Sequence, residues 1–447
     1  MKISKREKFY YGVGNLGYST VSSTLSNFIM FFGTSVLGVS GTLVGIAVSI
    51  SVLWDAISDP IIGYYSDNLN SSIGKRHPYM LIGVLGMCAI NLIVWLVPAS
   101  APQSIKFVWI LVSLLAVQTF CTCFSTPHLA LGLEMSQDPH EQTSIQCTRT
   151  IFQLIGMMLP TIFMFIFMPN SDGQGQLLTE GYVNTAYASS VICLVFGLIT
   201  FFGTLKRQVC CPAPQVPKKK ENLLSVFNDF FKILKKKQYR IVIFGYAVSL
   251  VASSILTAAG MHMFTYCFHF DSRQISICMG ALIISAVLAQ FFWERVSKRI
   301  GKKKTLIRGL SVGIIAIFVV WGIFVLRGLI PTIVLFYLIL PLIFVIGFGT
   351  GVLYSFPMSM FSDVMAKDDE ADAKNKVGVY SGIMTLAFKI SNALSLVIIG
   401  VVLDLIKFSS SSPVQPLSVQ NGLGLLVILG CLFSLGASIA IYNKFEE

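Results

Sequence analysis

Two aspartates stand four residues apart in an apolar stretch, where acidic side chains are rare and usually functional. They are Asp55 and Asp59, and in a helix this spacing places both carboxylates on one face. Two such carboxylates repel each other, and burial raises the cost of their charges further. A cation between them removes both penalties, so the pair predicts a site for Na⁺ or for a proton. The alternative is a kink at Asp59-Pro60 whose charge is paired with an arginine.

Two basic residues also interrupt apolar stretches, Arg149 and Lys389. A guanidinium group stays charged, so Arg149 requires an anion, either an aspartate or part of a solute. Lys389 is too deep in its stretch for its ammonium group to snorkel to the membrane surface, whereas Arg149 could do so. Lys389 could donate to solute hydroxyls, bind an anionic group or pair with an aspartate.

Hydroxyl groups accompany these charges. Ser58 stands between the two aspartates, and Pro60 frees a backbone carbonyl that could supply an oxygen ligand to the cation. The stretch 105–134 contains further candidates, Thr122, Ser125 and His128, and the first apolar stretch contains Ser19. Hydroxyl groups often serve helix packing, and a histidine beside a proline can be a packed neutral one or one that titrates near neutral pH.

Charged residues also gather in the loops. Asp67 precedes Lys75 and Arg76, and an acidic group begins at Glu134; a second acidic group begins at Asp363. Acidic loops opposite basic loops predict ion pairs that hold helix bundles closed, as a gate does. Simple solvated loops are the equal alternative.

The elements that position these residues are membrane helices. The chain has 447 residues, of which 54% are hydrophobic and 12% charged, far below the roughly 25% charged residues of soluble domains. Most apolar stretches reach the roughly 20 residues that cross a bilayer as a helix. Twelve are predicted, near 10–36, 41–66, 78–98, 105–134, 144–168, 183–205, 240–268, 275–296, 306–326, 330–356, 378–406 and 421–442.

The net charge of +12 follows membrane topology rather than nucleic-acid binding. When successive loops are assigned to alternate sides, 27 of the 33 lysines and arginines fall on the side of the N-terminus and four on the other. This asymmetry is typical of a cytoplasmic face. We therefore expect both termini in the cytoplasm, a multi-pass protein of the plasma membrane, and attraction to lipids but no nucleic-acid partner.

The chain divides at a basic, proline-rich segment, 206–239, whose second part from Glu221 has the apolar spacing of an amphipathic helix on the membrane surface. The parts on either side, 1–205 and 240–447, each hold six predicted helices. Gly74-Lys75-Arg76 and Gly301-Lys302-Lys303 stand at the same place in the two parts. This predicts an all-α membrane protein of two repeated six-helix halves, a transporter architecture.

These residues resemble the glycoside–pentoside–hexuronide:cation symporter family of the major facilitator superfamily, over nearly the whole chain. The resemblance is carried by Tyr11-Gly12-Val13-Gly14-Asn15, Trp54-Asp55-Ala56-Ile57-Ser58-Asp59-Pro60, Gly74-Lys75-Arg76, Pro127, Glu134, Arg149, Asp363, and Gly378-Val379-Tyr380-Ser381-Gly382 leading to Thr385 and Lys389. It implies a cation-coupled symporter of the major facilitator fold. It further implies that Asp55 and Asp59, with Thr122, bind the coupling ion, and that Arg149, Thr385 and Lys389 line a solute site between the halves.

The chain departs from the family's melibiose permease at three positions that hold its sugar. Ser19 and Ser125 stand in place of aspartates, and Leu129 stands in place of a tryptophan. Ser58 replaces an asparagine beside the cation, which leaves Na⁺ and H⁺ both open. A related branch that carries lysophospholipids also lacks the sugar aspartates. We therefore expect symport of a sugar, glycoside or similar polar solute, with an amphiphile as the alternative.

Other functions have little support in the sequence. A membrane enzyme would need a nucleophile or metal motif, and the chain has no G-x-S-x-G, H-E-x-x-H or Walker loop. The cysteine spacing is not that of a zinc site. A sensor would need an output domain. We expect no cofactor beyond the coupling ion, and a protein that works as a monomer.

Overall fold

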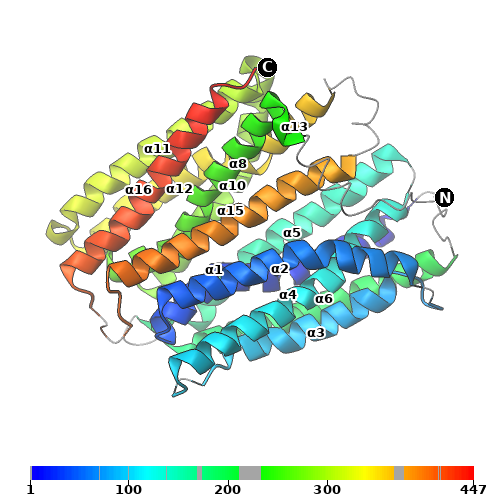
Figure 1. Ribbon diagram of the computed structural model, residues 1–447, viewed down its shortest axis with the longest axis horizontal. Helices are drawn as coiled ribbons and strands as arrows, with labels where there is room; N and C mark the ends of the chain where they lie inside the picture. Colours follow the sequence, from blue (N-terminus) through cyan, green and yellow to red (C-terminus); the bar gives the residue numbers. More distant parts are fainter. Residues whose placement is uncertain are drawn as a thin grey trace. The chain divides into compact units, whose positions relative to one another are not determined.

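The computed structural model describes residues 3–69, 71–98, 100–136, 138–168, 174–210, 233–366, 377–410, 412 and 414–446. Within these ranges all regular structure is helical, as Figure 1 shows. The predicted all-α fold class is confirmed. Of the segment with the amphipathic helix predicted from Glu221, only the part from residue 233 is described, and the acidic loop after Asp363 lies outside the described residues apart from Asp363 itself.

The chain forms two compact units, and the first consists mainly of residues 1–216. Its long helices are α1 (Lys5–Phe31), α2 (Gly41–Asn68), α3 (His77–Trp95), α4 (Gln103–Glu134), α5 (Pro139–Phe167) and α6 (Thr179–Cys210). A short π-helix, Phe32–Val36, extends α1, and a 3₁₀ turn, Gly175–Leu177, precedes α6. These bounds agree with the predicted segments to within a few residues.

The second unit contains most of residues 217–447. Its helices are α8 (Lys237–Ala258), α9 (Gly260–Tyr266), α10 (Ser272–Ile300), α11 (Lys302–Leu326), α12 (Thr332–Thr350), α13 (Phe356–Ala366), α15 (Val377–Leu405) and α16 (Leu417–Tyr442). The 3₁₀ turns Arg327–Leu329 and Gly351–Tyr354 follow α11 and α12. The predicted segment 240–268 is thus divided between α8 and α9.

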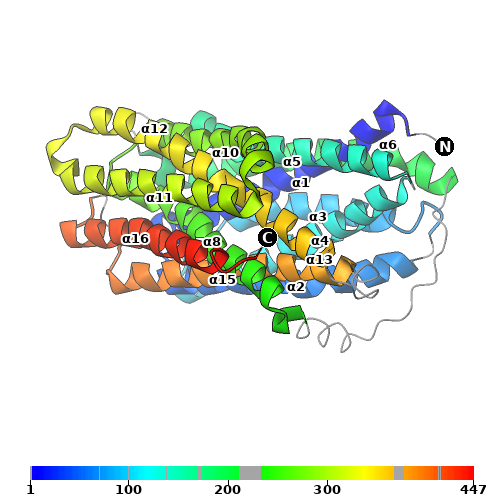
Figure 2. The ribbon, with the colours of Figure 1, turned by 90° about the horizontal axis from the view of Figure 1, so that it is seen from above.

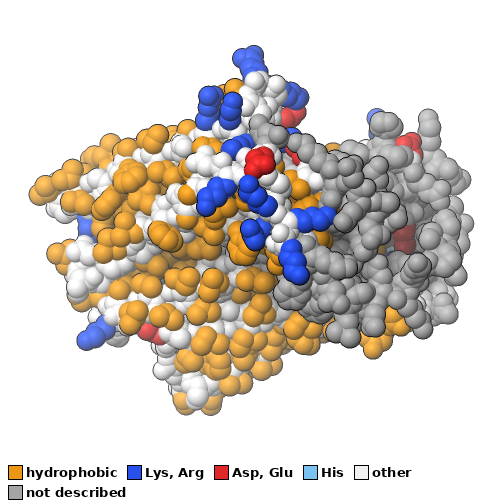
Figure 3. Space-filling view, turned by 45° about the horizontal axis from the view of Figure 1, so that its top comes forward, with side chains coloured by type: hydrophobic (Ala, Val, Ile, Leu, Met, Phe, Trp, Pro, Cys, Tyr) orange, Lys and Arg blue, Asp and Glu red, His pale blue; other side chains and the backbone are white. Residues whose placement is uncertain are grey.

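Eleven helical stretches in the described part of the chain are long and apolar enough to cross a membrane, so this is a multi-pass membrane protein. The predicted segment that falls short is the first. In α1 the positions Ser19, Thr20, Ser22, Ser23 and Thr24 lower the hydropathy, and many of its residues are buried inside the unit rather than facing lipid. Hydrophobic side chains cover much of the surface of the described residues in Figure 3.

The two units repeat one packing pattern. In the first, α1 packs on α5 and α6, and α3 packs on α4 and α6. In the second, α8 packs on α15 and α16, and α11 packs on α12 and α16. Figures 1 and 2 let the reader follow these neighbours within each unit. The first helix therefore meets the fifth and sixth, and the third meets the fourth and sixth, in both units.

Small residues allow these helices to approach closely, as in other membrane bundles. A Cβ atom at Gly17 of α1 would lie 2.8 Å from the Cα atom of Cys193 in α6. A Cβ atom at Gly132 of α4 would overlap the phenol ring of Tyr11 in α1. The buried core around Tyr11 includes Phe124 and Leu131 of α4, so α4 is held tightly against α1 at this level.

The tenth predicted segment contains a break. After α12, the chain forms a 3₁₀ turn at Gly351–Tyr354, bends at Ser355 and continues as α13. Pro357 cannot donate a backbone hydrogen bond and disfavours a continuous helix. Gln290 of α10 bridges the break, since its Nε2 donates to the Gly351 carbonyl at 2.5 Å and its Oε1 accepts from the Ser355 hydroxyl at 2.5 Å.

Candidate functional site

The acidic pair of α2 faces α4, which packs along it in the first unit. Thr122 of α4 donates its hydroxyl hydrogen to Oδ1 of Asp55 at 2.8 Å. The Ser58 hydroxyl lies 3.1 Å from the same threonine hydroxyl. Ser58 and Thr122 are buried, and Asp55 is half-buried. Three of the four residues predicted for the cation site thus meet in one polar cluster.

The fourth predicted residue, Asp59, meets a hydroxyl group that the sequence interpretation did not assign to a site. Thr126 of α4, one turn after Thr122, donates to Oδ1 of Asp59 at 3.0 Å. One turn before Thr122, the Thr119 hydroxyl accepts from the indole nitrogen of Trp54 at 2.9 Å. Threonines on three successive turns of α4 therefore contact polar residues of α2: Thr119 contacts Trp54, Thr122 contacts Asp55, and Thr126 contacts Asp59. The regular spacing of these threonines was the signal available in the sequence.

This arrangement offers oxygen ligands of the kind that hard cations prefer. Two carboxylates and three hydroxyl groups (Asp55, Asp59, Ser58, Thr122 and Thr126) gather along the contact of α2 with α4. The described residues contain no group of three or more histidine, cysteine or acidic side chains arranged for a metal ion. Two carboxylates with neutral oxygens suit a monovalent ion or a shared proton better than a transition metal.

Arg149 lies in α5, inside a stretch able to span the membrane. Its Nε atom is buried and has no hydrogen-bond partner among the described residues. Its backbone carbonyl accepts from the Asn15 amide at 3.5 Å, and the same amide reaches Gln153 Oε1 at 3.3 Å. The guanidinium group is therefore a charge in the first unit to which the described residues offer no ion pair. An anionic ligand would satisfy it.

The other predicted solute residues of the first unit occupy different surroundings. The Ser19 hydroxyl donates to the backbone carbonyls of Leu16 and Gln153, at 3.3 and 3.0 Å, and so contributes to the contact of α1 with α5. Ser125 is half-buried on α4, and no hydrogen bond of its side chain is observed among the described residues.

His128 is fully buried. Its ring stacks between Tyr11 and Phe124, with ring centroids 4.4 and 5.0 Å away. Its Nε2 lies 2.9 Å from the Tyr11 carbonyl oxygen, which requires a proton on that nitrogen. The packing against α1 is the environment of a core histidine. A contact between this imidazole and a solute would require that stack to open.

The predicted solute residues of the second unit lie on α15. Lys389 is 8% exposed, and Thr385 is exposed. They are four residues apart, so they share a face of the helix. A lysine buried this deeply in a membrane-spanning stretch requires polar neighbours, since a bare ammonium group in that setting is costly.

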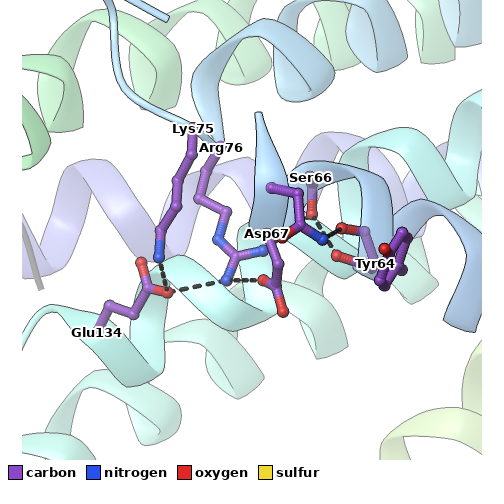
Figure 4. A network of polar contacts seen from close by, with 8 residues as sticks. Tyr64, Ser66, Asp67, Lys75, Arg76 and Glu134 are labelled. Atoms are coloured by element: carbon purple, nitrogen blue, oxygen red, sulfur yellow. Dashed lines mark hydrogen bonds and ion pairs between the residues drawn. The ribbon is translucent and has the colours of Figure 1, made fainter. Parts of the chain in front are cut away.

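The residues predicted to form a gate are ion-paired in the structure (Figure 4). Arg76, whose side chain is 4% exposed, pairs with Asp67 at the end of α2 and with Glu134 at the end of α4, the latter at 2.8 Å. Lys75 pairs with Glu134 at 3.2 Å, and Arg76 also donates to the Ser66 hydroxyl at 2.8 Å. This network ties the turn between α2 and α3 to the end of α4.

The second unit holds a simpler version of the same network. Gly74 and Gly301 both adopt positive φ angles, 87° and 85°, so the two basic turns share one backbone shape. Lys302, which follows Gly301 as Lys75 follows Gly74, pairs with Asp363 of α13 at 2.6 Å. The predicted gate residues thus link the ends of α2 and α4 to the start of α3 in the first unit, and the start of α11 to α13 in the second unit.

A second acidic contact holds the start of the chain. Glu141, at the start of α5, accepts from the Ser136 hydroxyl at 2.8 Å and from the Ile3 amide at 3.2 Å. The Ser136 hydrogen bond, the Ile3 amide and the charge of Lys8 lower the pKa of Glu141. Glu141 belongs to the acidic group that begins at Glu134 in the sequence.

Comparison with known proteins agrees with this architecture. The sequence model of the MFS/sugar transport protein family matches residues 10–443. The isoprimeverose transporter of Lactiplantibacillus pentosus is 25% identical over 71% of the chain, although the match spans only 64% of that relative. The uncharacterized symporter YnaJ of Bacillus subtilis is 24% identical over 100% of the chain and 93% of its own length.

An animal relative and solved structures complete the comparison. The sodium-dependent lysophosphatidylcholine symporter 1 of Xenopus tropicalis is 23% identical over 100% of the chain and 88% of its own length. The solved structure of a bacterial Spinster homologue has a TM-score of 0.68 at 12% identity, and the match covers 99% of the chain and 96% of that structure. The structure of a mutant of the nucleoside transporter NupG also has a TM-score of 0.68, at 14% identity, and covers 97% of the chain and 99% of its own. These structures share the predicted fold, and the chain belongs to the MFS/sugar transport protein family.

Proposed function

We propose that this protein is a secondary active transporter that couples the movement of a small organic solute to the movement of a cation in the same direction. The observation that carries the proposal is the polar contact of α2 with α4, where Thr122 and Thr126 bond Asp55 and Asp59. Symporters among the relatives support the same reaction class. We further propose a plasma-membrane location with both termini in the cytoplasm, and function as a monomer.

The cation acts by cancelling the repulsion of the two carboxylates. Without it, the pair destabilises any conformation that buries both charges. When the cation is bound, the conformation in which the pair is buried and the solute is bound becomes more populated. This is a population shift between conformations that exist without the cation. The coupling is reciprocal, so bound solute must tighten the cation site by the same factor. The two units supply the halves that alternate access requires.

The solute is proposed to be a sugar, a glycoside or a related polar molecule, in line with the name of the isoprimeverose transporter. Arg149, which has no ion pair among the described residues, favours a solute that carries an acidic group or several oxygen atoms. Thr385 and Lys389 of α15 would supply further donors. The second candidate is a lysophospholipid, because a lysophosphatidylcholine symporter matches the whole chain and the phosphate group would also satisfy Arg149.

The coupling ion is Na⁺ or H⁺. Ser58 and the two threonines place neutral oxygen atoms beside the carboxylates, which suits Na⁺. A shared proton would satisfy the carboxylates equally well. Sodium appears in the name of the lysophosphatidylcholine relative, which supports testing it first.

The test is uptake into proteoliposomes under an imposed Na⁺ or H⁺ gradient, with sugars, uronides and lysolipids as candidate solutes. Wild-type protein should accumulate its solute above equilibrium only when one of the two gradients is present. Asp59→Cys should retain solute exchange but lose gradient-driven accumulation. Accumulation that is the same with and without both gradients would exclude cation coupling.

A further inference from the structure

The turn between α10 and α11 carries an excess of positive charge that its counterpart in the first unit lacks. Residues 294–308 contain seven lysines and arginines and one acidic residue, whereas the corresponding residues 67–81 contain two basic residues and one acidic residue. In the first unit Asp67 and Glu134 neutralise both basic side chains. The repeat thus provides an internal comparison: the same turn forms in the first unit with two basic residues.

The contacts of the second unit leave several of these charges unmatched. Lys298 pairs with Glu294, and Lys302 pairs with Asp363. Lys303 donates to the backbone carbonyls of Asn443 and Phe445, at 2.9 and 2.6 Å. Lys298, Lys302 and Lys303, which flank Gly301, therefore have polar partners.

The four other cations of this segment, Arg295, Arg299, Lys304 and Arg308, are exposed and make no ion pair or hydrogen bond with the described residues. Lys304 and Arg308 are four residues apart on α11 and so share one face of that helix. We call Arg299, Lys304 and Arg308 the basic stripe. Figure 3 shows lysine and arginine side chains gathered in one band beside the exposed apolar surface.

The level of the basic stripe relative to the membrane follows from the helices that carry it. The membrane-spanning stretches Ser272–Ile300 and Lys302–Leu329 are separated by Gly301 alone. Arg299 therefore stands in the last turn of one span, and Lys304 in the first turn of the next. Side chains at these positions reach the headgroup region of a bilayer, where anionic lipids attract lysine and arginine.

We propose that the basic stripe binds the headgroup of an anionic phospholipid at the membrane surface. The apolar flanks of α10 and α11, which include the exposed residues Phe291, Phe292 and Ile315, would contact the acyl chains. A guanidinium group and an ammonium group attract the negative charge of a phosphate diester and offer hydrogen-bond donors to its oxygen atoms. This interaction is separate from the solute and cation sites and does not depend on the proposed transport reaction.

The test uses the full-length protein in nanodiscs of phosphatidylcholine with increasing mole fractions of phosphatidylglycerol, with retained lipid measured by native mass spectrometry. Wild type should retain phosphatidylglycerol selectively, and high salt should weaken this retention. Lys304→Gln/Arg308→Gln should lower the retention roughly tenfold or more, since each basic residue near an anionic surface contributes to binding. The melting temperature in pure phosphatidylcholine should remain that of wild type.

The matched control is Lys5→Gln/Arg6→Gln, which removes one lysine and one arginine from exposed positions at the start of α1. It should retain phosphatidylglycerol like wild type. Equal losses in both double variants would identify nonspecific charge attraction and overturn the proposal. Glycerol phosphate, which lacks acyl chains, should not compete with the lipid at equal concentration. Competition by glycerol phosphate, or retention that is insensitive to the basic-stripe variant, would also overturn it.

Discussion

Thr126 donates its hydroxyl hydrogen to Asp59 across the same sequence separation, 67 residues, that joins Thr122 to Asp55. From the first contact to the second, the position moves four residues along both α2 and α4, so the two helices run in the same direction here. The Thr126 hydroxyl group therefore has the same position relative to Asp59 as the Thr122 hydroxyl group has relative to Asp55. Thr126 joins the proposed cation site for this reason, although nothing in its type distinguished it from other membrane threonines.

The Thr126→Val substitution should weaken cation binding while keeping the fold, because valine has nearly the same shape and lacks the oxygen atom. Hydrogen bonds to charged groups contribute about 1.5–3 kcal/mol, so the cation concentration for half-maximal uptake should rise roughly tenfold or more. Thr119→Val is the matched control, since that hydroxyl group contacts Trp54 rather than a carboxylate. If both valine variants changed the cation concentration for half-maximal uptake equally, the threonines of α4 would serve only helix packing.

Arg149→Gln should raise the solute concentration for half-maximal exchange far more than it changes the maximal rate, if the guanidinium group binds the solute directly. Arg149→Lys should recover only part of the affinity, because an ammonium group cannot make the paired contacts of a guanidinium group. The measurement is equilibrium exchange in proteoliposomes without a gradient. An unchanged affinity in Arg149→Gln, at unchanged protein stability, would remove this residue from the solute site.

The Arg76 network and its counterpart in the second unit should differ in strength. Glu134→Gln removes one partner from a buried guanidinium group, a change that costs about 3–5 kcal/mol in buried ion pairs. Asp363→Asn breaks a half-exposed pair with Lys302, which should cost no more than about 1 kcal/mol. Thermal unfolding in detergent should therefore separate the two variants clearly. Similar melting temperatures would mean that Asp67 alone satisfies Arg76.

Gln290→Leu should destabilise the break in the tenth predicted segment, because both the Gly351 carbonyl and the Ser355 hydroxyl lose their partner. Leaving the buried Gly351 carbonyl unsatisfied costs about 1–3 kcal/mol, and the melting temperature should fall accordingly. Gln290→Glu should also destabilise the break, since its carboxylate can accept from Ser355 but cannot donate to the Gly351 carbonyl. Thr350→Val, which removes only a bond to the Ile346 carbonyl of the same helix, is the control. Hydrogen exchange at Gly351–Tyr354 would locate the effect.

The contact of Glu141 with the start of the chain should depend on pH. Its pKa is lowered in the folded protein, chiefly by the Ser136 hydroxyl group, so the contact is fully present above the ordinary glutamate pKa of about 4.3. It should be lost as the pH falls through the lowered value, because protonation weakens the bonds from Ser136 and Ile3. The protection factor of the Ile3 amide, corrected for intrinsic exchange, measures this. Glu141→Gln should show a low protection factor that does not vary with pH.

Much of the fold could be predicted because a bilayer permits so few solutions. Runs of about 20 apolar residues can cross it only as helices, and the observed bounds fall within a few residues of the predicted ones. The exceptions have physical causes. The hydroxyl groups of α1 lower its hydropathy, and the break at Gly351–Ser355 interrupts the predicted segment 330–356 although the sequence there remains apolar.

The site was harder to predict, because the contacts of a side chain depend on which helices become neighbours. The charges in apolar stretches made Asp55 and Asp59 candidates, and the family resemblance added Thr122, which contacts Asp55 in the structure. Neither could show that His128 stacks between two aromatic rings or that the Ser19 hydroxyl bonds the backbone of α5. Those facts follow from the packing of α1 on α4 and α5, which no single stretch of sequence specifies.

The close approach of Gly132 to the Tyr11 ring has an evolutionary consequence. A larger residue at position 132 can be accommodated only if the aromatic ring at position 11 is lost or shifts, and a smaller residue at position 11 would leave a void beside the glycine. The two positions should therefore vary together among homologous sequences, although 121 residues separate them in the chain. An alignment in which they vary independently would mean that this helix contact is not shared by the family.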